Sequence, residues 1–181
     1  MLLIINICKE KLHSYEFVKP IEDILKNKGL KFETKHYKEI DEKNIKKYNR
    51  IIICGTSLKD FDYLIPENLK KFGWIKICEK PVLGICGGMQ IIGSVFGSKL
   101  KKKTEIGLYT EKFKKDFLGL SGEHEVYHLH NDYITLPENF DEFTLSKIPQ
   151  AIKHKSRQIY GILFHPEVRN TEIIKNFCEL Q

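Results

Sequence analysis

The sequence predicts an α/β protein: an open, mainly parallel twisted sheet flanked by helices, with an antiparallel or mixed strand portion in the C-terminal half. In the first half of the chain, short apolar runs alternate with helix-like segments, as in strands covered on both faces. The second half has short strand candidates separated by turn signals. No repeat or low-complexity linker divides the 181 residues, so we expect a single domain over residues 1–181.

The first half alternates regularly. Apolar runs predict strands at 2–8, 30–37, 50–54 and 82–85. Helices are predicted at 20–28, where Pro20 stands near the start, at 42–47 with Asp41 as the cap, and from 66 to about 79. This alternation implies right-handed crossovers and parallel strands. Functional residues in such a sheet gather at the carboxyl ends of the strands.

The second half is expected to add short strands against or beside the parallel sheet. The predicted strands are 99–102, 107–113, 123–128, 143–146, 150–153 and 159–164, with turns at 121–122 and 136–139. A last helix is expected after Thr171, which would cap it, with Ile173, Ile174 and Phe177 on one face.

Composition and charge exclude several classes of protein. The formal net charge is +6, but lysines spread along the chain supply nearly all of the positive charge, which favours a solvated surface over a nucleic-acid interface. No run approaches the roughly 18 apolar residues of a membrane span. The five cysteines are scattered, and no Cys-x-x-Cys pair is present. We therefore expect a cytoplasmic protein with no disulfide framework, no zinc site and no membrane or nucleic-acid partner.

The segment around Cys86 carries the strongest chemical signal. An apolar strand meets Gly84-x-Cys86-x-Gly88 and then a helix-like stretch, which is the nucleophile-elbow pattern with cysteine in place of serine. Glycines two positions before and after the nucleophile allow strand and helix to approach closely. The helix N-terminus would favour a thiolate and an oxyanion. Buried, unreactive cysteines can have the same neighbours, so a partner base is needed.

His165-Pro166-Glu167 supplies a base and an acid together. Pro166 favours an extended conformation at His165, and in extended chain residues i and i+2 project to the same side. Glu167 could then accept one imidazole N–H while the other nitrogen faces a thiol. His128 and His130, with Asp132 two residues further on, are rival bases. A strand-end histidine paired with a surface glutamate is the other interpretation of His165.

Together these segments resemble the class I, triad-type glutamine amidotransferases. The elbow of that family is matched by Gly84-Ile-Cys-Gly-Gly-Met-Gln90, and its C-terminal motif by Phe164-His-Pro-Glu-Val168. The segment 171–177 is similar to the final helix of the family. In general form the chain resembles the glutaminase subunit of guanylate synthase, ahead of the anthranilate and aminodeoxychorismate synthase subunits.

The resemblance implies a role for each matching residue. Cys86 would attack glutamine, His165 would move the proton, and Glu167 would orient the imidazole. Backbone N–H groups of Gly87 and of the turn with Gly55 and Thr56 would hold the oxyanion. The residues implied to contact the substrate are Gln90, Asn131 and Asp132, the last two in a loop. Glutamine would be hydrolysed through a thioester, with no cofactor or metal.

Two positions depart from the family. Many members have Ser-Gly-Gly-Pro where this chain has Cys54-Gly55-Thr56-Ser57, and leucine, tyrosine or phenylalanine is common where this chain has Gly87. Thr56 can act as an oxyanion donor only if its side chain tolerates the required backbone conformation.

Three functions follow from these residues. The first is a stand-alone glutaminase subunit that passes ammonia to a separate ATP-dependent synthetase, since a chain of this length is not expected to carry a synthetase domain. The second is a thiol hydrolase of the same fold that acts on γ-glutamyl or peptide bonds. The third is a catalytically silent regulatory subunit, suggested by the altered turn at 54–57.

Overall fold

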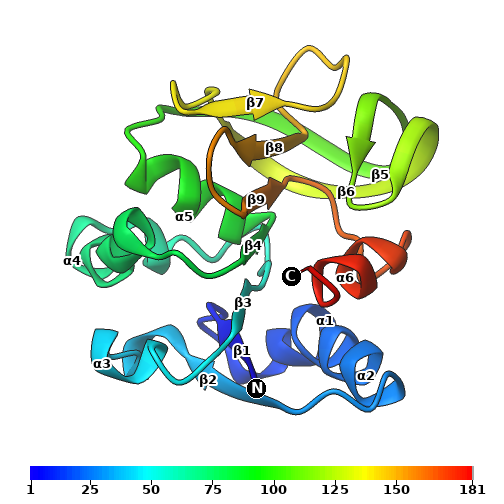
Figure 1. Cartoon of the computed structure of the whole chain (residues 1–181). Coiled ribbons are helices and arrows are strands. Elements are labelled where there is room, and N and C mark those ends of the chain that lie inside the picture. Colours follow the sequence, from blue (N-terminus) through cyan, green and yellow to red (C-terminus); the bar gives the residue numbers. More distant parts are fainter. Residues whose placement is uncertain (181) are drawn as a thin grey trace.

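The central element is a seven-stranded sheet, seen in a computed structural model that describes residues 1–180; Gln181 lies outside the described residues. The strand order is β2-β1-β3-β4-β9-β8-β7 (Figure 1). In that order the strands span Phe32–His36, Leu2–Asn6, Arg50–Ile53, Val82–Ile85, Ile159–Ile162, Ala151–His154 and Phe140–Glu142. The strands from β2 to β9 pair in parallel, and β8 and β7 add antiparallel pairs. The predicted fold class is confirmed.

Helices cover both faces of this sheet (Figure 1). One face carries α1 (Ser14–Phe17), α2 (Lys19–Asn27) and α6 (Glu172–Phe177), and the other carries α3 (Glu42–Ile45), α4 (Pro66–Leu69) and α5 (Gly87–Val95). Four 3₁₀ segments complete the connections: η1 (Lys11–His13), η2 (Tyr37–Glu39), η3 (Asp62–Leu64) and η4 (Lys70–Ile77). Within residues 1–180 no helix exceeds nine residues, and none has the length and apolarity needed to cross a membrane.

Alternation along the buried strands divides the core into two clusters. In β1, Leu2 and Ile4 pack with the α2 and α6 side, whereas Leu3 and Ile5 pack with the α5 side. Each of these side chains is almost completely buried. Burial of a side chain of this size contributes about 1.5–3 kcal/mol to the free energy of folding. The uniformly apolar runs in the sequence therefore reflect a sheet that is covered on both faces.

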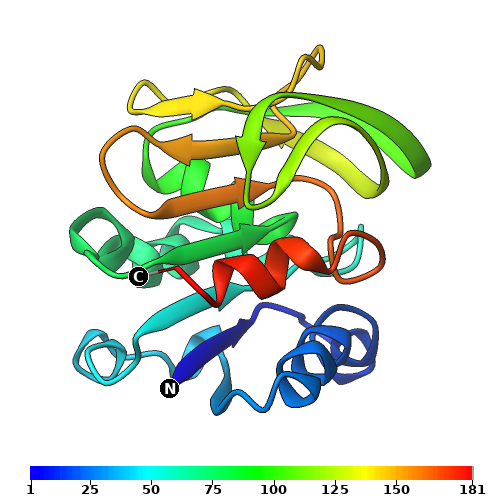
Figure 2. The same ribbon diagram turned by 45° about the vertical axis from the view of Figure 1, so that its right-hand side comes forward.

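A long antiparallel ribbon lies over the upper part of the sheet (Figure 2). It consists of β5 (Leu100–Phe117) and β6 (Leu120–Ile134), which pair only with each other as a sheet. Phe113, Phe117 and Val126 join the core cluster that includes Phe177 of α6. Of the predicted C-terminal strands, some extend the main sheet as β8 and β7. Others form this ribbon, which lies against the sheet.

The ribbon corrects several predicted boundaries. The separate strands predicted at 99–102 and 107–113 are one strand, and the strand predicted at 123–128 continues to Ile134. The chain reverses at Leu118 and Gly119, which have φ values of 50° and 92°, and not at 121–122. The sequence does not show these boundaries clearly, because β5 lies largely on the surface and mixes charged residues with exposed apolar ones such as Ile106 and Leu108.

Other elements differ in detail from the prediction. The strand predicted at 143–146 is reduced to a single bridge between Thr144 and Phe113, and β7 lies just before it. The predicted helix at 66–79 is a short α4 followed by a 3₁₀ segment. Asp41 caps α3 as expected, accepting a hydrogen bond from the Lys43 N–H, whereas the Thr171 side chain makes no capping hydrogen bond.

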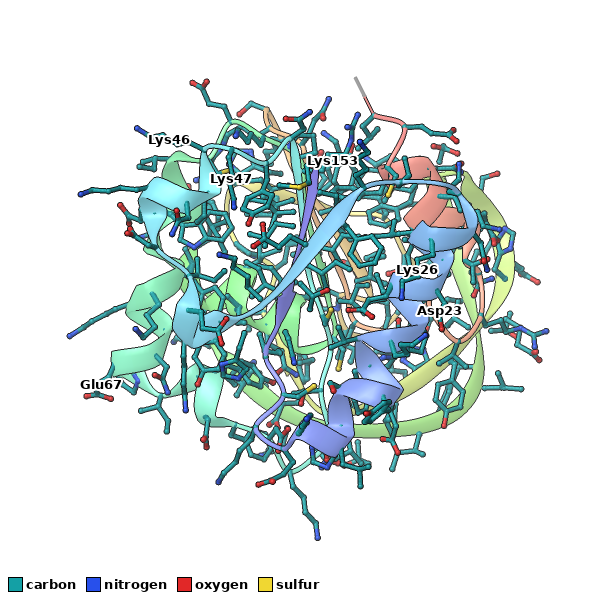
Figure 3. The ribbon with its side chains drawn as sticks, turned by 90° about the horizontal axis from the view of Figure 1, so that it is seen from below. Asp23, Lys26, Lys46, Lys47, Glu67 and Lys153 are labelled. Carbon is teal, nitrogen blue, oxygen red and sulfur yellow. The ribbon has the colours of Figure 1, made fainter. Side chains whose placement is uncertain are left out.

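The charged side chains of the lower half lie on the outside of the fold (Figure 3). Lys26, Lys46, Lys47 and Glu67 are exposed. Lys47 forms an ion pair with Glu33 at 3.0 Å. The positive charge of the chain is thus distributed over solvated side chains of several elements.

Candidate active site

Cys86 lies at a sharp, strained turn between β4 and α5. Its backbone has φ 48° and ψ −102°, which a non-glycine residue rarely adopts, at a typical cost of about 1–3 kcal/mol. A Cβ on Gly84 would lie 2.5 Å from the backbone of Gly88, and one on Gly88 would lie 2.3 Å from the Ile53 carbonyl oxygen. The close approach inferred from the two glycines is therefore present, and only glycine fits at either position.

Gly87 is also enclosed by its neighbours. A Cβ at this position would lie 2.7 Å from Cδ1 of Ile7 and 3.0 Å from the hydroxyl oxygen of Tyr63. Tyr63 fills the space beside the first turn of α5 and donates a hydrogen bond of 2.6 Å to Oε1 of Gln90. A side chain at position 87 would therefore have to displace both Ile7 and Tyr63, two contacts that the sequence did not reveal.

His165 and Glu167 form a buried pair just after β9. Nδ1 of His165 lies 2.7 Å from Oε1 of Glu167, and both side chains are at most 1% exposed. The His165 backbone N–H donates to the Tyr127 carbonyl of β6 at 2.8 Å, which fixes the segment against the ribbon. The proposed i, i+2 arrangement of acid and imidazole is present in this geometry.

The pair lies directly beside Cys86. A Cβ on Gly55 would lie 2.8 Å from Cε1 of His165 and 3.4 Å from Cβ of Cys86, so the turn after β3 packs against both residues. Burial alone would lower the pKa of His165, but the Glu167 carboxylate and the Cys86 sulfur together hold that pKa well above its usual value. Nε2 of His165 is buried and makes no well-aligned hydrogen bond with any residue in the described range 1–180. The arrangement suits proton exchange between a thiol and an imidazole.

The other four cysteines lie in different surroundings. Burial raises the pKa of Cys54 and Cys78 above the usual thiol value, and raises the pKa of Cys8 and Cys178 to about 11. These groups remain neutral thiols at physiological pH, and all five cysteines are free. Only the thiolate is a good nucleophile, so none of these four fits that role.

Thr56 is held in place by a buried carboxylate. Its hydroxyl donates to Oδ2 of Asp60 at 2.6 Å, and the same oxygen is within 3.0 Å of the Lys9 N–H and of Nδ1 of His13. Burial acts to raise the pKa of Asp60, but the hydrogen bonds from Thr56, His13 and Lys9 hold it below its usual value. In the described chain, three non-glycine residues have a positive φ, and Thr56 is not one of them. Its backbone therefore has a conformation that threonine adopts without strain.

A small cleft, open to solvent, leads to Cys86. Its wall brings together five of the residues predicted for the site: Thr56, Cys86, Gln90, Asn131 and Asp132. Asn131 and Asp132 belong to β6 and not to a loop, which corrects the predicted local structure. Sγ of Cys86 lies 3.5 Å from the Leu129 carbonyl oxygen of the same strand. β6 therefore forms one wall of the cleft.

Gln90 connects the walls of the cleft. Its Nε2 donates to the Asp132 carbonyl at 2.9 Å, and its Oε1 accepts from Tyr63. Both the oxygen and the nitrogen of this buried amide are thus hydrogen-bonded within the protein. Gln90, on the same helix face as Cys86, therefore holds β6 and η3 in place around the cleft. Asn131 is also engaged, since its Oδ1 accepts from Thr104 at 2.9 Å.

Asp132 presents a buried negative charge to the cleft. Its side chain is 2% exposed, and Nζ of Lys102 lies 2.9 Å from its Oδ1. Neither carboxylate oxygen makes a well-aligned hydrogen bond within residues 1–180. A buried carboxylate with unfilled acceptor capacity favours a cationic or donor group of a ligand. His128 and His130, the alternative candidates for the base, pair with a different carboxylate: one ring nitrogen of each lies close to Glu105.

Sequence reasoning missed several residues that shape this site, among them Asp60, Tyr63 and Leu129. Asp60 precedes η3 and Tyr63 lies within it, in a stretch without a recognisable motif, and Leu129 contributes a backbone carbonyl. Phe17 of α1 is a further example, because its ring packs against His165 at 5.5 Å between centroids. A local motif could not reveal these contacts, which join segments far apart in the chain.

Comparison with known proteins gives consistent matches. Residues 12–180 match the family model for class-I glutamine amidotransferases. Over 157 residues the chain is 42% identical to the A subunit of the glutamine-hydrolyzing GMP synthase of Methanosphaera stadtmanae, covering 73% of this chain and 84% of that protein. It is 37% identical over 158 residues to the glutamine-hydrolyzing GMP synthase of Staphylococcus carnosus, covering 78% of this chain but only 30% of that longer protein.

Solved structures agree with the fold. A protein from Thermoplasma acidophilum, described as a candidate A subunit of GMP synthase, superposes with a TM-score of 0.84 at 25% identity, covering 98% of this chain and 92% of that one. A glutamine amidotransferase from Thermotoga maritima matches with a TM-score of 0.73 at 24% identity, covering 98% of this chain and 80% of that one, and supports the fold alone. With the family model covering nearly its whole length, this chain belongs to the class-I glutamine amidotransferase family.

Proposed function

We propose that this chain is the glutaminase subunit of a GMP synthase, hydrolysing glutamine at Cys86 and delivering ammonia to a separate synthetase subunit. The observation that carries the chemistry is the buried His165–Glu167 pair packed, with Gly55, against the strained Cys86 turn. The choice of GMP synthase rests on relatives that are named as the A subunit of that enzyme, one of them matched over 84% of its length.

In the proposed mechanism, His165 takes the proton of Cys86 through Nε2. The Glu167 carboxylate holds the Nδ1–H and stabilises the imidazolium that results. The thiolate then attacks the side-chain amide carbon of glutamine. The raised pKa of His165 favours this charged pair at neutral pH.

The tetrahedral oxyanion is assigned to backbone N–H groups. Gly87 provides the first N–H of α5, where helix N-termini offer unpaired donors and a positive dipole end. Gly55 and Thr56 would supply the second donor from the turn after β3. Removing one donor of this kind typically lowers kcat by about 100- to 1,000-fold.

Collapse of this intermediate completes the first half of the reaction. His165 donates its proton to the departing nitrogen, so ammonia leaves and a γ-glutamyl thioester remains on Cys86. Water, deprotonated by His165, then releases glutamate and restores the thiol. These steps need no cofactor.

Residues of β6 are proposed to bind the amino-acid end of glutamine. Asp132 would pair with the α-ammonium group, and Asn131 would help position the substrate, with Gln90 holding the strand. An Asp132→Asn variant should therefore raise KM for glutamine by about tenfold or more with a smaller change in kcat, since hydrogen bonds to charged groups contribute about 1.5–3 kcal/mol. An unchanged KM would remove Asp132 from this role. Asp141→Asn, on β7, is the matched control.

The proposed partner is an ATP-dependent synthetase subunit that consumes the ammonia. The relatives are named as one lettered subunit of their enzyme, which implies at least one further subunit. We place the reaction in the cytoplasm, where free cysteines stay reduced.

The deciding experiment measures glutamate release from glutamine, with and without a candidate synthetase subunit, ATP and xanthosine monophosphate. The wild-type chain should release glutamate, and Cys86→Ser should abolish the release. Cys178→Ser is the control, because Cys178 is also a free, buried cysteine but lies at the end of α6. An electrophilic glutamine analogue should label Cys86, and glutamine should protect it.

The same assay separates the alternatives. Turnover of γ-glutamyl peptides without any partner, in place of glutamine, would point to a thiol hydrolase of the same fold. No labelling and no turnover with the partner present would point to a silent regulatory subunit. Stimulation by a different synthetase would keep the glutaminase chemistry but overturn the assignment to GMP synthase.

A further inference from the structure

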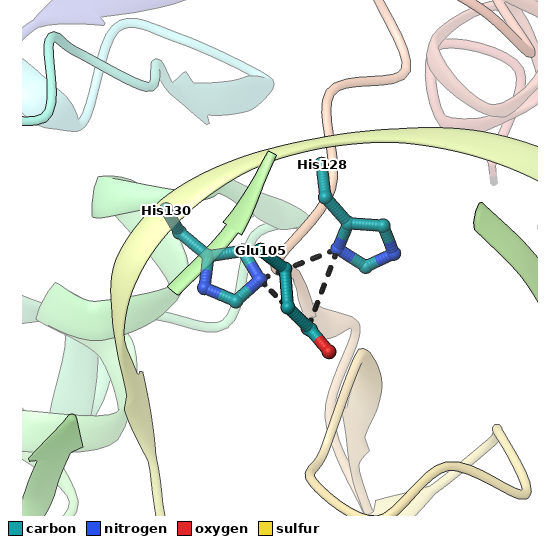
Figure 4. A group of neighbouring side chains, drawn as sticks. All are labelled: Glu105, His128 and His130. Atoms are coloured by element: carbon teal, nitrogen blue, oxygen red, sulfur yellow. Dashed lines mark hydrogen bonds and ion pairs between the residues drawn. The ribbon is translucent and has the colours of Figure 1, made fainter. Parts of the chain in front are cut away.

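Three buried side chains on the β5–β6 ribbon point toward one another (Figure 4). They are Glu105 of β5 and His128 and His130 of β6, and each is at most 7% exposed. The proposed glutaminase mechanism uses none of them. Burying two imidazoles and a carboxylate is costly unless their charges and lone pairs are satisfied. Nζ of Lys103 lies 2.6 Å from Oε1 of Glu105 and offsets the charge of the carboxylate, but the imidazole nitrogens that face this group still call for an explanation.

The positions of the ring protons follow from the outer contacts. Nδ1 of His130 lies 3.2 Å from the Lys103 carbonyl oxygen, which can only accept, so Nδ1 carries the proton and Nε2 keeps its lone pair. Nε2 of His128 lies 3.3 Å from Oε1 of Glu111 but makes no well-aligned hydrogen bond within residues 1–180. A proton on this nitrogen, facing the carboxylate, leaves the lone pair of His128 on Nδ1. Carboxylate or carbonyl partners of this kind are typical of metal-binding histidines.

Three acceptor atoms then face one another. Nε2 of His130 is 3.1 Å from Oε2 of Glu105, Nδ1 of His128 is 3.8 Å from the same oxygen, and the two nitrogens are 3.3 Å apart. Without a proton or cation among them, their lone pairs repel. Zinc–ligand bonds of about 2.1 Å in tetrahedral geometry place the ligand atoms about 3.4 Å apart. The observed separations bracket this spacing.

The backbone of the ribbon is adapted to form this cluster. Lys102 pairs with Asp132, but the next pair is Glu105 with His130, so β5 contains one extra residue at this point. This bulge turns Glu105, and not Thr104, toward His130. The side chains of His128 and His130 lie on the same face of β6, because residues i and i+2 of a strand do. Gln150 steadies the carboxylate by donating to Oε2 of Glu105 at 2.8 Å.

We propose that Glu105, His128 and His130 bind one divalent transition-metal ion, of the Zn²⁺ type, with water completing the coordination. Two imidazoles and one carboxylate are a ligand set that Zn²⁺ accepts, whereas Ca²⁺ and Mg²⁺ prefer oxygen ligands alone. No zinc site was expected from the sequence, because the five cysteines are scattered and no Cys-x-x-Cys pair is present.

The metal would act on the structure of the ribbon. Leu129, whose carbonyl oxygen contacts Sγ of Cys86, lies between the two histidines. An ion at this site would fix the register of β5 and β6 where β6 forms the wall of the cleft. We assign the metal ion a positioning role, because the ring nitrogens that would bind the ion face Glu105.

The test is direct metal binding by the full chain. Protein stripped with a chelator should bind one equivalent of Zn²⁺ in calorimetric titration and retain it through gel filtration, as measured by elemental analysis. Co²⁺ in place of Zn²⁺ should give the visible absorption of a tetrahedral site. His128→Gln and Glu105→Gln should each weaken the affinity by more than about 100-fold, since even outer-shell changes cost 10- to 100-fold.

Two controls distinguish this site from other zinc ligands. His124→Gln changes a histidine of the same strand whose Nε2 lies 2.9 Å from the Ser121 carbonyl oxygen, and this variant should bind Zn²⁺ as the wild type does. Zinc can also bind an active-site thiol, so Cys86→Ser tests this alternative. If the proposed site is the one that binds, the variant should retain the ion. Absence of stoichiometric binding, equal binding by His128→Gln with native circular dichroism, or loss of binding in Cys86→Ser would each overturn the proposal.

Discussion

Tyr63 occupies part of the space that a side chain on Gly87 would need: a Cβ there would lie 3.0 Å from the tyrosine hydroxyl oxygen, next to Cδ1 of Ile7 at 2.7 Å. Gly87 lies directly after the nucleophile, and its N–H is a proposed oxyanion donor. Tyr63 in turn holds Gln90, which bonds to the backbone of β6. The bare glycine and the buried tyrosine therefore form one packing unit beside Cys86.

This unit predicts a compensating pair of substitutions. Gly87→Leu should destabilise the protein by about 1–3 kcal/mol through overpacking, and Tyr63→Ala by about 3–5 kcal/mol through the cavity that it leaves. In the double variant leucine fills part of that cavity, so the loss should be smaller than the sum. Urea unfolding of the four proteins measures this coupling.

Gly73→Ala is the control for adding a side chain to a glycine, because a Cβ at Gly73 meets no atom within 4 Å. Its unfolding free energy should stay within about 0.5 kcal/mol of the wild type. Additive losses in the double variant would show that Tyr63 and Gly87 do not constrain each other.

The Glu167 carboxylate should control the alkaline limit of activity. His165 must be protonated to donate to the departing ammonia, and its raised pKa keeps it protonated to higher pH. Glu167→Gln removes the attraction that raises this pKa, so the alkaline limb of the kcat profile should move to lower pH. By analogy with the acid of a serine triad, kcat should fall by about 100-fold or more. An unshifted limb in the pH–rate profile would contradict this role.

The same pair predicts a pH dependence of stability. The folded-state pKa of His165 lies above its unfolded value of about 6.5, so the protonated ring stabilises the fold fully below that pH. The contribution is lost as pH rises through the folded-state pKa. The difference in unfolding free energy between wild type and Glu167→Gln should therefore be larger at pH 6 than at pH 9. Equal differences at both pH values would exclude the linkage.

The Thr56 hydroxyl should position the turn after β3. Thr56→Val removes its hydrogen bond to the ionised Asp60, which should cost about 1.5–3 kcal/mol of stability. The displaced turn should lower kcat by up to about 100-fold, as small misplacements do. Thr56→Ser keeps the hydroxyl and should behave like the wild type in glutamate release. Full activity of Thr56→Val would show that the turn does not depend on Asp60.

The parallel part of the sheet and the residues that point to the chemistry could be predicted from the amino-acid sequence. Strands such as β3 and β4 are buried on both faces, so their residues are almost all apolar and the pattern is clear without tertiary information. The turn at Cys86 can also be predicted from the sequence, because the close approach of strand and helix restricts positions 84 and 88 to glycine. His165 and Glu167 were predictable because both groups lie within three residues.

The ribbon and the walls of the cleft, in contrast, became visible only in the folded chain. The exposed side of β5 mixes charged and apolar residues, and a bulge after Lys102 changes which residues face each other. Neither the length of the ribbon nor the Glu105–His130 pair therefore follows from local pattern. Tyr63 beside Gly87, Asp60 beneath Thr56 and Leu129 beside Cys86 join separate parts of the chain. Such contacts depend on how packed elements meet in space, which a local sequence pattern does not encode.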